Sequence, residues 1–333
     1  MPVTLRDVAR HLKLSHATVS FVLNDRRDIS IPQATRDRVF QAAKELGYQP
    51  NRAAKALASG RTQMIALWTP TSFNSYYASI LYHLQQLSRD AGYDIIYRQV
   101  VFDEERSDSN LRSLAWPVDA VLAVDAKYIL ENIAAFMALP HPPIVSIGAY
   151  TAPEFDAVTV DLYSGTQMAL NHLAEIGRPN VGFVRFLNPI DQHDPRAAAY
   201  NDYCASNGIE PKVLEMSSFN RSVVRHEIRE LAKSGKIPEA LFCYNDHIAI
   251  STIRGLKEAG FRVPEDCAVI GCDGIDEADL IDPSLTTIAQ PIKQMCAKGW
   301  EFMIERIHDS SLATRKVELL PELVIRESTS AAQ

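Results

Sequence analysis

Features that mark several other classes of protein are scarce or missing in this chain. Its cysteines are few, odd in number and not at metal-ligand spacing; they are Cys204, Cys243, Cys267, Cys272 and Cys296. This pattern is typical of free thiols in a reducing cytoplasm. No apolar run is long enough to span a bilayer, and the charges that recur from Arg6 onward argue against a secretory signal. We therefore expect a cytoplasmic protein with no membrane partner and no bound metal.

Sequence signatures of catalysis are missing as well. The chain has no phosphate-binding glycine loop, no Gly-x-Ser-x-Gly elbow and no His-Glu-x-x-His motif. His172, His193 and His247 are not spaced as a metal set, and surface or hydrogen-bonded histidines are the simpler interpretation. We expect neither an enzyme nor a cofactor.

The charge of the chain is distributed very unevenly. Overall, 34 Lys and Arg face 41 Asp and Glu, a formal charge of −7, which by itself argues against nucleic acid. Residues 1–62, however, contain 11 basic and 5 acidic residues, or +6, and this leaves 23 basic and 36 acidic residues, or −13, for the remaining 271. A basic head can release counterions from DNA while an acidic body stays away from it.

Local signals predict three short helices in this basic head. Thr4 and Asp7 form a capping-box pattern before a helix with an apolar face at Leu5, Val8, Ala9 and Leu12. Ser15 is placed to cap a second helix, whose buried stripe is Val19, Val22 and Leu23. A third helix is predicted to begin near Ser30, with Pro32 in its first turn and Gln33 at the capping-box position, and to end at Gly47. Two short helices joined by a tight turn and followed by a third describe a helix-turn-helix DNA reader.

The segments 3–9, 15–24 and 46–52 closely resemble the lactose/galactose repressor family, and the resemblance extends over essentially the whole chain. It implies a helix-turn-helix domain at residues 1–48, with its second helix in the major groove of operator DNA. His16 then faces base edges, Ala17 can contact a thymine methyl, and Thr18 and Ser20 help to hold phosphates. Seen alone, the Ser and Thr hydroxyls are only caps and surface groups. The DNA-contacting residues of this part are expected to be Thr4, Leu5, Ser15, His16, Ala17, Thr18, Ser20, Phe21 and Asn24.

Two residues of the head depart from the family pattern. Phe21 stands where many members carry Arg, so a bidentate contact with guanine is lost. Either the operator differs at this position, or the Phe21 ring packs against the sugar-phosphate backbone of the DNA. Lys13 stands in the turn where Gly is frequent, so a mildly strained left-handed residue or an altered turn is expected.

Residues 49–62 form the second motif. The resemblance implies a hinge helix that pairs with its dimer mate and enters the minor groove, with Leu57 as the wedge between base steps. Its DNA-contacting residues would be Asn51, Arg52, Lys55, Leu57 and Ala58. The alternative is a linker helix that buries Leu57 in a core. The polar joint of residues 59–62 favours the hinge.

From Gln63 onward, apolar strands alternate with helices, and the series restarts at Val181. Such a pattern indicates α/β lobes with parallel sheets covered on both faces. The resemblance implies the two-lobed, periplasmic-binding-protein-like core of the family. We assign residues 63–161 with about 291–320 to the N-lobe, and residues 162–290 with about 321–330 to the C-lobe.

An effector is expected between these lobes, at the carboxyl ends of the strands. The resemblance and the strand ends together give the effector-binding residues Phe73, Tyr76, Tyr77, Arg196, Phe219, Asp246, Asp273 and Gln290. Asp246 can equally cap a helix, Asp273 can merely fix a turn, Phe219 can be plain core, and at least one of the adjacent tyrosines should be packing. Arg196 stands out, because a helix start is a poor place to bury an unpaired charge. Asp161 resembles a family position at the lobe crossover, where a short polar contact can favour the open or the closed arrangement of the lobes.

The sequence thus predicts a cytoplasmic, nucleoid-associated repressor. Two heads of a homodimer would bind operator DNA, and a sugar-like effector in the core would shift a two-state equilibrium. A dimer is favoured over a tetramer because no heptad tail follows residue 326. A solute-binding protein for a transporter is opposed by the basic head. A regulator that responds to a non-sugar metabolite or to a protein partner stays open.

Overall fold

The structure is a computed structural model that describes residues 3–24, 26–49, 56–57, 59–70, 74–100, 117–134, 141–152, 154–186 and 194–330. The chain folds as two compact units, Met1–Thr62 and Gln63–Gln333, called the head and the core below. In the described ranges, no helix has the length and apolar character needed to cross a membrane. The same residues contain no cluster of His, Cys, Asp and Glu that is arranged to hold a metal ion.

The head is a three-helix unit with a small apolar core. Its helices are α1 (Leu5–Leu12), α2 (His16–Leu23) and α3 (Gln33–Leu46). The predicted caps of the first two are confirmed: Thr4 and Asp7 form a capping box, and the Ser15 side chain accepts a hydrogen bond from the Thr18 amide. The core of the head is Val8, Ala9, Val19, Val22, Val39 and Ala42.

The start of α3 differs from the prediction. The helix begins at Gln33 and not near Ser30, and Pro32, with φ −54° and ψ 140°, is the extended residue before it. A proline disfavours the α conformation in the residue that precedes it, so Ile31 cannot belong to the helix. Gln33 therefore forms no capping box, and its side chain donates to Asp37 instead, at 2.8 Å. Gly47 ends α3 with φ +68°, as predicted.

The core contains two six-stranded sheets. The first has the order β11-β5-β4-β3-β1-β2, and all of its strand pairs are parallel. Its strands are β1 (Met64–Thr69), β2 (Asp94–Gln99), β3 (Ala120–Val124), β4 (Ile144–Ile147), β5 (Asp156–Val160) and β11 (Lys316–Leu319). The second has the order β12-β10-β9-β8-β6-β7 and is parallel except for β12. Its strands are β6 (Val181–Phe186), β7 (Lys212–Met216), β8 (Ala240–Cys243), β9 (Ala268–Asp273), β10 (Thr286–Ala289) and β12 (Glu322–Val324).

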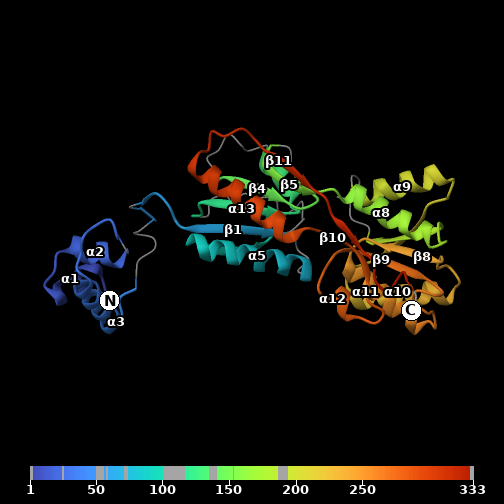
Figure 1. Ribbon diagram of the computed structural model, residues 1–333, viewed down its shortest axis with the longest axis horizontal. Coiled ribbons are helices and arrows are strands. Elements are labelled where there is room, and N and C mark those ends of the chain that lie inside the picture. Colours follow the sequence, from blue (N-terminus) through green and yellow to red (C-terminus); the bar gives the residue numbers. More distant parts are fainter. Residues whose placement is uncertain are drawn as a thin grey trace. The chain divides into compact units, whose positions relative to one another are not determined.

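Helices cover the sheets on both faces, as the near-continuous apolar strands predicted. In β1, Ile65 and Leu67 face the core cluster that includes Ile80 of α5, whereas Ala66 and Trp68 face the cluster on the opposite side. Figure 1 shows α5 running along β1. The helices of the core are α5 (Ser75–Ala91), α7 (Lys127–Ala134), α8 (Leu162–Glu175), α9 (Pro195–Asn207), α10 (Arg221–Lys233), α11 (Asp246–Glu258), α12 (Glu277–Leu280) and α13 (Ile292–His308).

The chain passes from one sheet to the other after β5, after β10 and after β11. Asp161 lies at the first of these crossovers. Its backbone N–H donates to Leu319 O at 2.9 Å, and its side chain caps α8 by accepting from the Ser164 amide at 2.9 Å. Asp161 thus makes a strand-like bond and a helix cap at the point where the chain crosses between the sheets.

Candidate DNA-binding head and inter-lobe site

The first turn of α2 presents the residues predicted to reach DNA. His16 and Ala17 are exposed, and the Ser15 hydroxyl bonds both the Thr18 amide at 3.0 Å and the Thr18 hydroxyl at 2.8 Å. These local bonds fix the start of the helix, so the two exposed side chains stand on a rigid first turn. Thr4 and Leu5 begin α1, where the Thr4 hydroxyl donates to Asp7 at 2.6 Å.

The turn before α2 contains a left-handed residue, as predicted. Lys13 has φ 55° and ψ 37°, and its backbone N–H reaches the carbonyls of Ala9 and Arg10. A non-glycine residue pays a conformational cost in this region. The turn therefore keeps its geometry without a glycine, and the charged Lys13 side chain is added to its exposed surface.

Phe21 is half-buried at the end of α2, and the Arg26 guanidinium lies 6.0 Å from its ring centroid. Arg26 is held in place by two hydrogen bonds to Asp28, of 2.5 and 2.7 Å. Nearby, the Asn24 amide donates to the backbone and side-chain oxygens of Ser20. Phe21 thus has a cation beside it, although it cannot itself bind guanine by hydrogen bonds.

Leu57 is the most exposed large apolar side chain of the described residues, at 90 %. Burial of Leu57 in a core, the alternative that the sequence left open, is therefore wrong for this structure. Asn51, Arg52, Lys55 and Ala58 lie outside the described residues.

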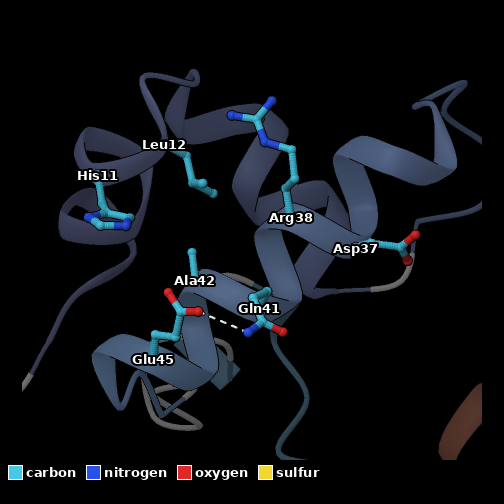
Figure 2. A pocket seen from close by; sticks show the side chains of 7 residues that line it. All are labelled: His11, Leu12, Asp37, Arg38, Gln41, Ala42 and Glu45. Atoms are coloured by element: carbon cyan, nitrogen blue, oxygen red, sulfur yellow. Dashed lines mark hydrogen bonds between the residues drawn. The ribbon is translucent and has the colours of Figure 1, made fainter.

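The head also has a hollow of about 410 Å³ between α1 and α3. Figure 2 shows the Gln41 amide bonded to Glu45 at this place, at 2.8 Å. The residues that line the hollow are His11, Leu12, Asp37, Arg38, Gln41, Ala42 and Glu45. None of them belongs to α2, so this hollow is separate from the surface that the first turn of α2 presents.

Polar side chains of both lobes meet at the carboxyl ends of the strands. We call this group the inter-lobe cluster; it consists of Tyr76, Tyr77, Asp125, Tyr150, Asp194, Arg196, Tyr244, Asp273 and Gln290. Four of these, Asp125, Tyr150, Asp194 and Tyr244, were missed from the sequence. Asp125, Tyr150 and Tyr244 follow β3, β4 and β8 within three residues, so the strand-end rule that selected Asp246 and Asp273 would have found them.

Arg196 lies at the centre of the cluster and is only 3 % exposed. Asp194, the N-cap of α9, accepts hydrogen bonds from Arg196 Nε at 3.0 Å and Nη2 at 2.8 Å. Burial alone would raise the pKa of Asp194, but the Arg196 charge and these bonds hold it below the ordinary value. Arg196 is thus buried but not unpaired, because Asp194, two residues earlier, supplies its counter-ion; its role as an effector contact stays a prediction.

Tyr150 connects this ion pair to the N-lobe. Its hydroxyl donates to Asp194, accepts from Arg196 Nη2 at 2.7 Å and bonds the Tyr244 hydroxyl at 2.8 Å. Arg196 Nη1 donates to Tyr244 O at 2.9 Å, and the guanidinium carbon lies 3.7 Å from the Tyr244 ring centroid. The Tyr150 phenol of the N-lobe thus joins three groups of the C-lobe, Asp194, Arg196 and Tyr244.

Asp125 and Asp273 are the other two carboxylates of the cluster. Asp125 accepts from the Ala149 and Tyr150 amides at 2.7 and 3.4 Å, and burial raises its pKa to about 6. Asp273 accepts from Gln290 Nε2 at 3.0 Å; burial, and then the neighbouring Asp246 carboxylate, raise its pKa well above the ordinary value. Asp273 also has φ +130°. Strained backbone of this kind is concentrated at functional sites.

Both adjacent tyrosines take part in the inter-lobe cluster. Tyr76 packs in the apolar core, as expected of at least one of them, yet its hydroxyl donates to Gln290 at 3.3 Å. Tyr77 hydrogen-bonds Asp125, and its ring meets that of Tyr76 edge-on, with centroids 5.1 Å apart. Phe73, predicted on the same loop, lies outside the described residues.

The interpretation of Asp246 as a helix cap is wrong. Asn245 caps α11, by accepting from the Ile248 amide at 2.9 Å. Asp246 is fully buried and accepts from the Gly274 and Ile275 amides and the Thr287 hydroxyl, at 2.8, 2.9 and 2.6 Å. Asp246 thus fixes the turn after Asp273. The alternative interpretation, in which Asp273 merely fixes this turn, is not needed.

Phe219 is 37 % exposed, so it is not plain core. Its ring centroid lies 4.3 Å from that of Phe186 and 6.3 Å from that of Tyr244. Through Tyr244, this aromatic row continues onto the Arg196 guanidinium. Phe219 therefore stands at the outer end of one side of the inter-lobe cluster.

His247 departs from the expectation of a surface or fully bonded histidine. It is buried at the start of α11, where Nε2 accepts from the Ser75 amide of the N-lobe at 3.1 Å. Its Nδ1 has no partner among the described residues. Burial, and then the Arg221 charge, lower its pKa to about 4, so the ring is neutral at pH 7. His172 bonds Thr329 at 2.9 Å, and His193 lies outside the described residues.

The replacement Asp125→Asn is expected to remove a pH-dependent loss of stability. A pKa raised from 3.8 to about 6 stabilises the folded state below pH 3.8, and this contribution is lost as the pH rises through 6. The shift in pKa corresponds to roughly 3 kcal/mol in the free energy of unfolding. The charged and titratable groups near Asp125 include Arg196, Tyr76, Tyr77 and Asp273. In urea unfolding, the variant should therefore gain stability relative to wild type between pH 4 and 7. A difference that stays constant over this range would contradict the assignment.

Comparisons with known proteins agree with this architecture. Residues 4–51 match the family of bacterial regulatory proteins of the lacI type, and residues 170–329 match a periplasmic binding protein-like domain. A similar protein is the HTH-type transcriptional repressor PurR of Aliivibrio salmonicida, 29 % identical over 331 residues and covering 98 % of both chains. The ribose operon repressor of Halalkalibacterium halodurans is 26 % identical and covers 99 % of this chain and 98 % of its own.

Among solved structures, the lac repressor dimer bound to operator and the anti-inducer ONPF has a similar fold. Its TM-score is 0.82 at 24 % identity, and the match covers 99 % of this chain and 100 % of the other. The helix-turn-helix head and the two-sheet core thus occur together in this order over nearly the full length. The chain thus carries a DNA-binding domain of the lacI family of bacterial regulatory proteins and a periplasmic binding protein-like domain, and over nearly its whole length it is similar to proteins named as transcriptional repressors.

Proposed function

We propose that this protein is a repressor that binds double-stranded operator DNA through its head and is controlled by a small molecule bound between the lobes of its core. The observation that carries the proposal is the pairing of an exposed first turn of α2 with a buried, polar inter-lobe cluster. The relatives named as transcriptional repressors support it over almost the whole chain.

From the sequence, we assign a role to each part of the chain. Residues 1–48 bind the major groove, residues 49–62 form the hinge, and residues 63–161 with about 291–320 and 162–290 with about 321–330 form the two lobes. The strand pairs support the division into two lobes, because β11 pairs with β5 in the first sheet, whereas β12 pairs with β10 in the second. We place the protein in the cytoplasm, at its DNA.

On the DNA side, we propose that His16 and Ala17 read bases and that Thr18 and Ser20 position the helix on phosphates. Phe21, with Arg26 beside it, is expected to change operator preference relative to members that carry Arg at its position. Leu57 is proposed to wedge between base steps of the minor groove when two hinges meet in a homodimer.

On the effector side, we propose contacts from Arg196, Asp273, Gln290, Tyr76, Tyr77 and Phe219, together with Phe73. Asp246 is reassigned to a positioning role, because its oxygens already accept three hydrogen bonds from the C-lobe. A sugar or sugar derivative is the class that we propose, and the ribose operon repressor among the relatives supports it. The effector acts to the extent that it binds one arrangement of the lobes better than the other.

The test is selection of DNA by the full chain from a random duplex pool. We expect enrichment of a pseudopalindrome with two half-sites, and affinity that falls steeply with salt. His16→Ala should relax the preference at one position, at a cost of roughly 1–3 kcal/mol. Gln41→Ala, in the hollow of Figure 2, is the control and should select the same sequence. Failure to enrich any sequence would refute the proposed function.

A further inference from the structure

The first residue of α5, in the N-lobe, is bonded to two helices of the C-lobe. Asn74 caps α5 by accepting from the Tyr77 amide, and the amide of Ser75 has no acceptor inside its own helix. His247 Nε2, in α11, accepts from the Ser75 amide at 3.1 Å. The Ser75 hydroxyl donates to Glu277, the first residue of α12. Both donors of Ser75 are thus used by the other lobe.

His247 is built into the C-lobe as a hydrogen-bond acceptor. It is the second residue of α11 and is only 7 % exposed. Arg221 Nη2 also lies 3.3 Å from its Nε2, and because a guanidinium can only donate, two donors face one lone pair. The proton of the neutral ring is therefore on Nδ1, which has no partner in the described part of the chain. The orientation of the ring is thus set by what Nε2 accepts.

The same turn of α5 carries two residues of the inter-lobe cluster. Tyr76 and Tyr77 follow Ser75 directly, and the Tyr76 hydroxyl donates to Gln290 at 3.3 Å. The contacts of Ser75 reach α11 and α12, whereas those of Tyr150 reach α9 and the end of β8, so the lobes are joined at two separate places. A movement of the C-lobe relative to α5 breaks the Ser75 bonds, because hydrogen bonds fail beyond about 3.5 Å.

We propose that Ser75, His247 and Glu277 form an inter-lobe latch, which holds the two lobes of the core in the arrangement of this structure. Its two bonds are of effective kinds: one is shielded from water by the burial of His247, and the other is a charge-assisted bond to a carboxylate. An effector that favours another arrangement of the lobes must open the latch. This last step rests on the proposed function, whereas the latch itself does not.

Ser75→Pro opens the latch while it preserves the start of α5. Proline has neither the amide N–H nor the hydroxyl, and it is favoured at the first position of a helix. Asn74 is already extended, with φ −143° and ψ 178°, as the residue before a proline should be. His247→Leu removes the acceptor at similar size, whereas His247→Gln keeps one near the position of Nε2. His226→Leu makes the same change at an exposed histidine that bonds Arg229 within α10, and is the control.

The measurement is the distance between the lobes of the full-length, ligand-free protein, by double electron–electron resonance. Spin labels are attached at two exposed positions, Asp90→Cys of the N-lobe and Ser206→Cys of the C-lobe, and the five native cysteines are buried. Dilution with unlabelled protein restricts the signal to distances within one chain.

The two variants that open the latch should shift the equilibrium between lobe arrangements by about tenfold or more, which appears as a second population of distances. His247→Gln and His226→Leu should keep the wild-type distribution. Thermal unfolding of the same samples checks that each variant is folded, and Ser75→Pro tests the latch even if His247→Leu does not fold. A wild-type distribution in Ser75→Pro would overturn the proposal.

Operator affinity of the same variants separates the latch from the proposed function. If the lobes control the head, opening the latch should change the affinity for the selected duplex about fivefold or more without any ligand. If the distances change and the operator affinity does not, the latch stands and the proposed control of DNA binding by the core is refuted.

Discussion

Asp194→Ala is expected to destabilise the core by about 3–5 kcal/mol, the cost of leaving a buried charge without its partner. Arg196 would lose the counter-ion that accepts two of its hydrogen bonds, at 3 % exposure. Tyr150 would lose its acceptor as well, so the N-lobe would be held less firmly to the C-lobe. For a core of this size, the loss corresponds to a fall in the thermal midpoint of roughly 6–20 °C.

The measurement is urea or thermal unfolding of the full chain, with Asp266→Ala as the matched control. Asp266 also bonds an arginine of the C-lobe, accepting two hydrogen bonds from the Arg262 guanidinium and one from its backbone N–H, but this pair lies at the surface, and surface ion pairs contribute little. Its loss should leave the midpoint nearly unchanged. Equal effects of the two replacements would show that Arg196 finds other acceptors, and that the ion pair does not fix the inter-lobe cluster.

Leu57→Ala is expected to weaken operator binding by roughly 30- to 150-fold, that is by about 2–3 kcal/mol. Leu57 is 90 % exposed in the structure, so its removal should cost the folded protein almost nothing. A wedge that enters the minor groove, however, loses apolar burial when it is shortened to a methyl group. The loss should therefore appear only when DNA is present.

Titration of a fluorescent operator duplex measures this effect, and thermal unfolding of the same samples checks stability. Ile325→Ala, which shortens an exposed aliphatic side chain of the core, is the control and should bind the operator normally. If Leu57→Ala binds with wild-type affinity, the hinge assignment for residues 49–62 is incorrect.

Features that depend on neighbours along the chain were predictable. The Thr4–Asp7 capping box, the Ser15 cap, the left-handed Lys13 and the end of α3 at Gly47 all involve residues within a few positions of one another. The apolar runs of the core were equally informative, because a strand buried on both faces must be apolar along its whole length. α3 starts later than its pattern predicted, because Pro32 disfavours the α conformation in the residue before it.

Composition and local pattern alone thus determined the basic head, the acidic body, the helix-turn-helix and the alternation of strands and helices. Tertiary structure decided what each polar side chain of the site does. Tyr150 and Arg196 are 46 positions apart, Ser75 and His247 are 172 apart, and Tyr76 and Gln290 are 214 apart. The sequence could place Asp246 and Asp273 at strand ends, but only the folded chain shows that three C-lobe donors satisfy the first and one satisfies the second. The physical reason is that a buried carboxylate is defined by its donors, and those donors come from segments that only folding brings together.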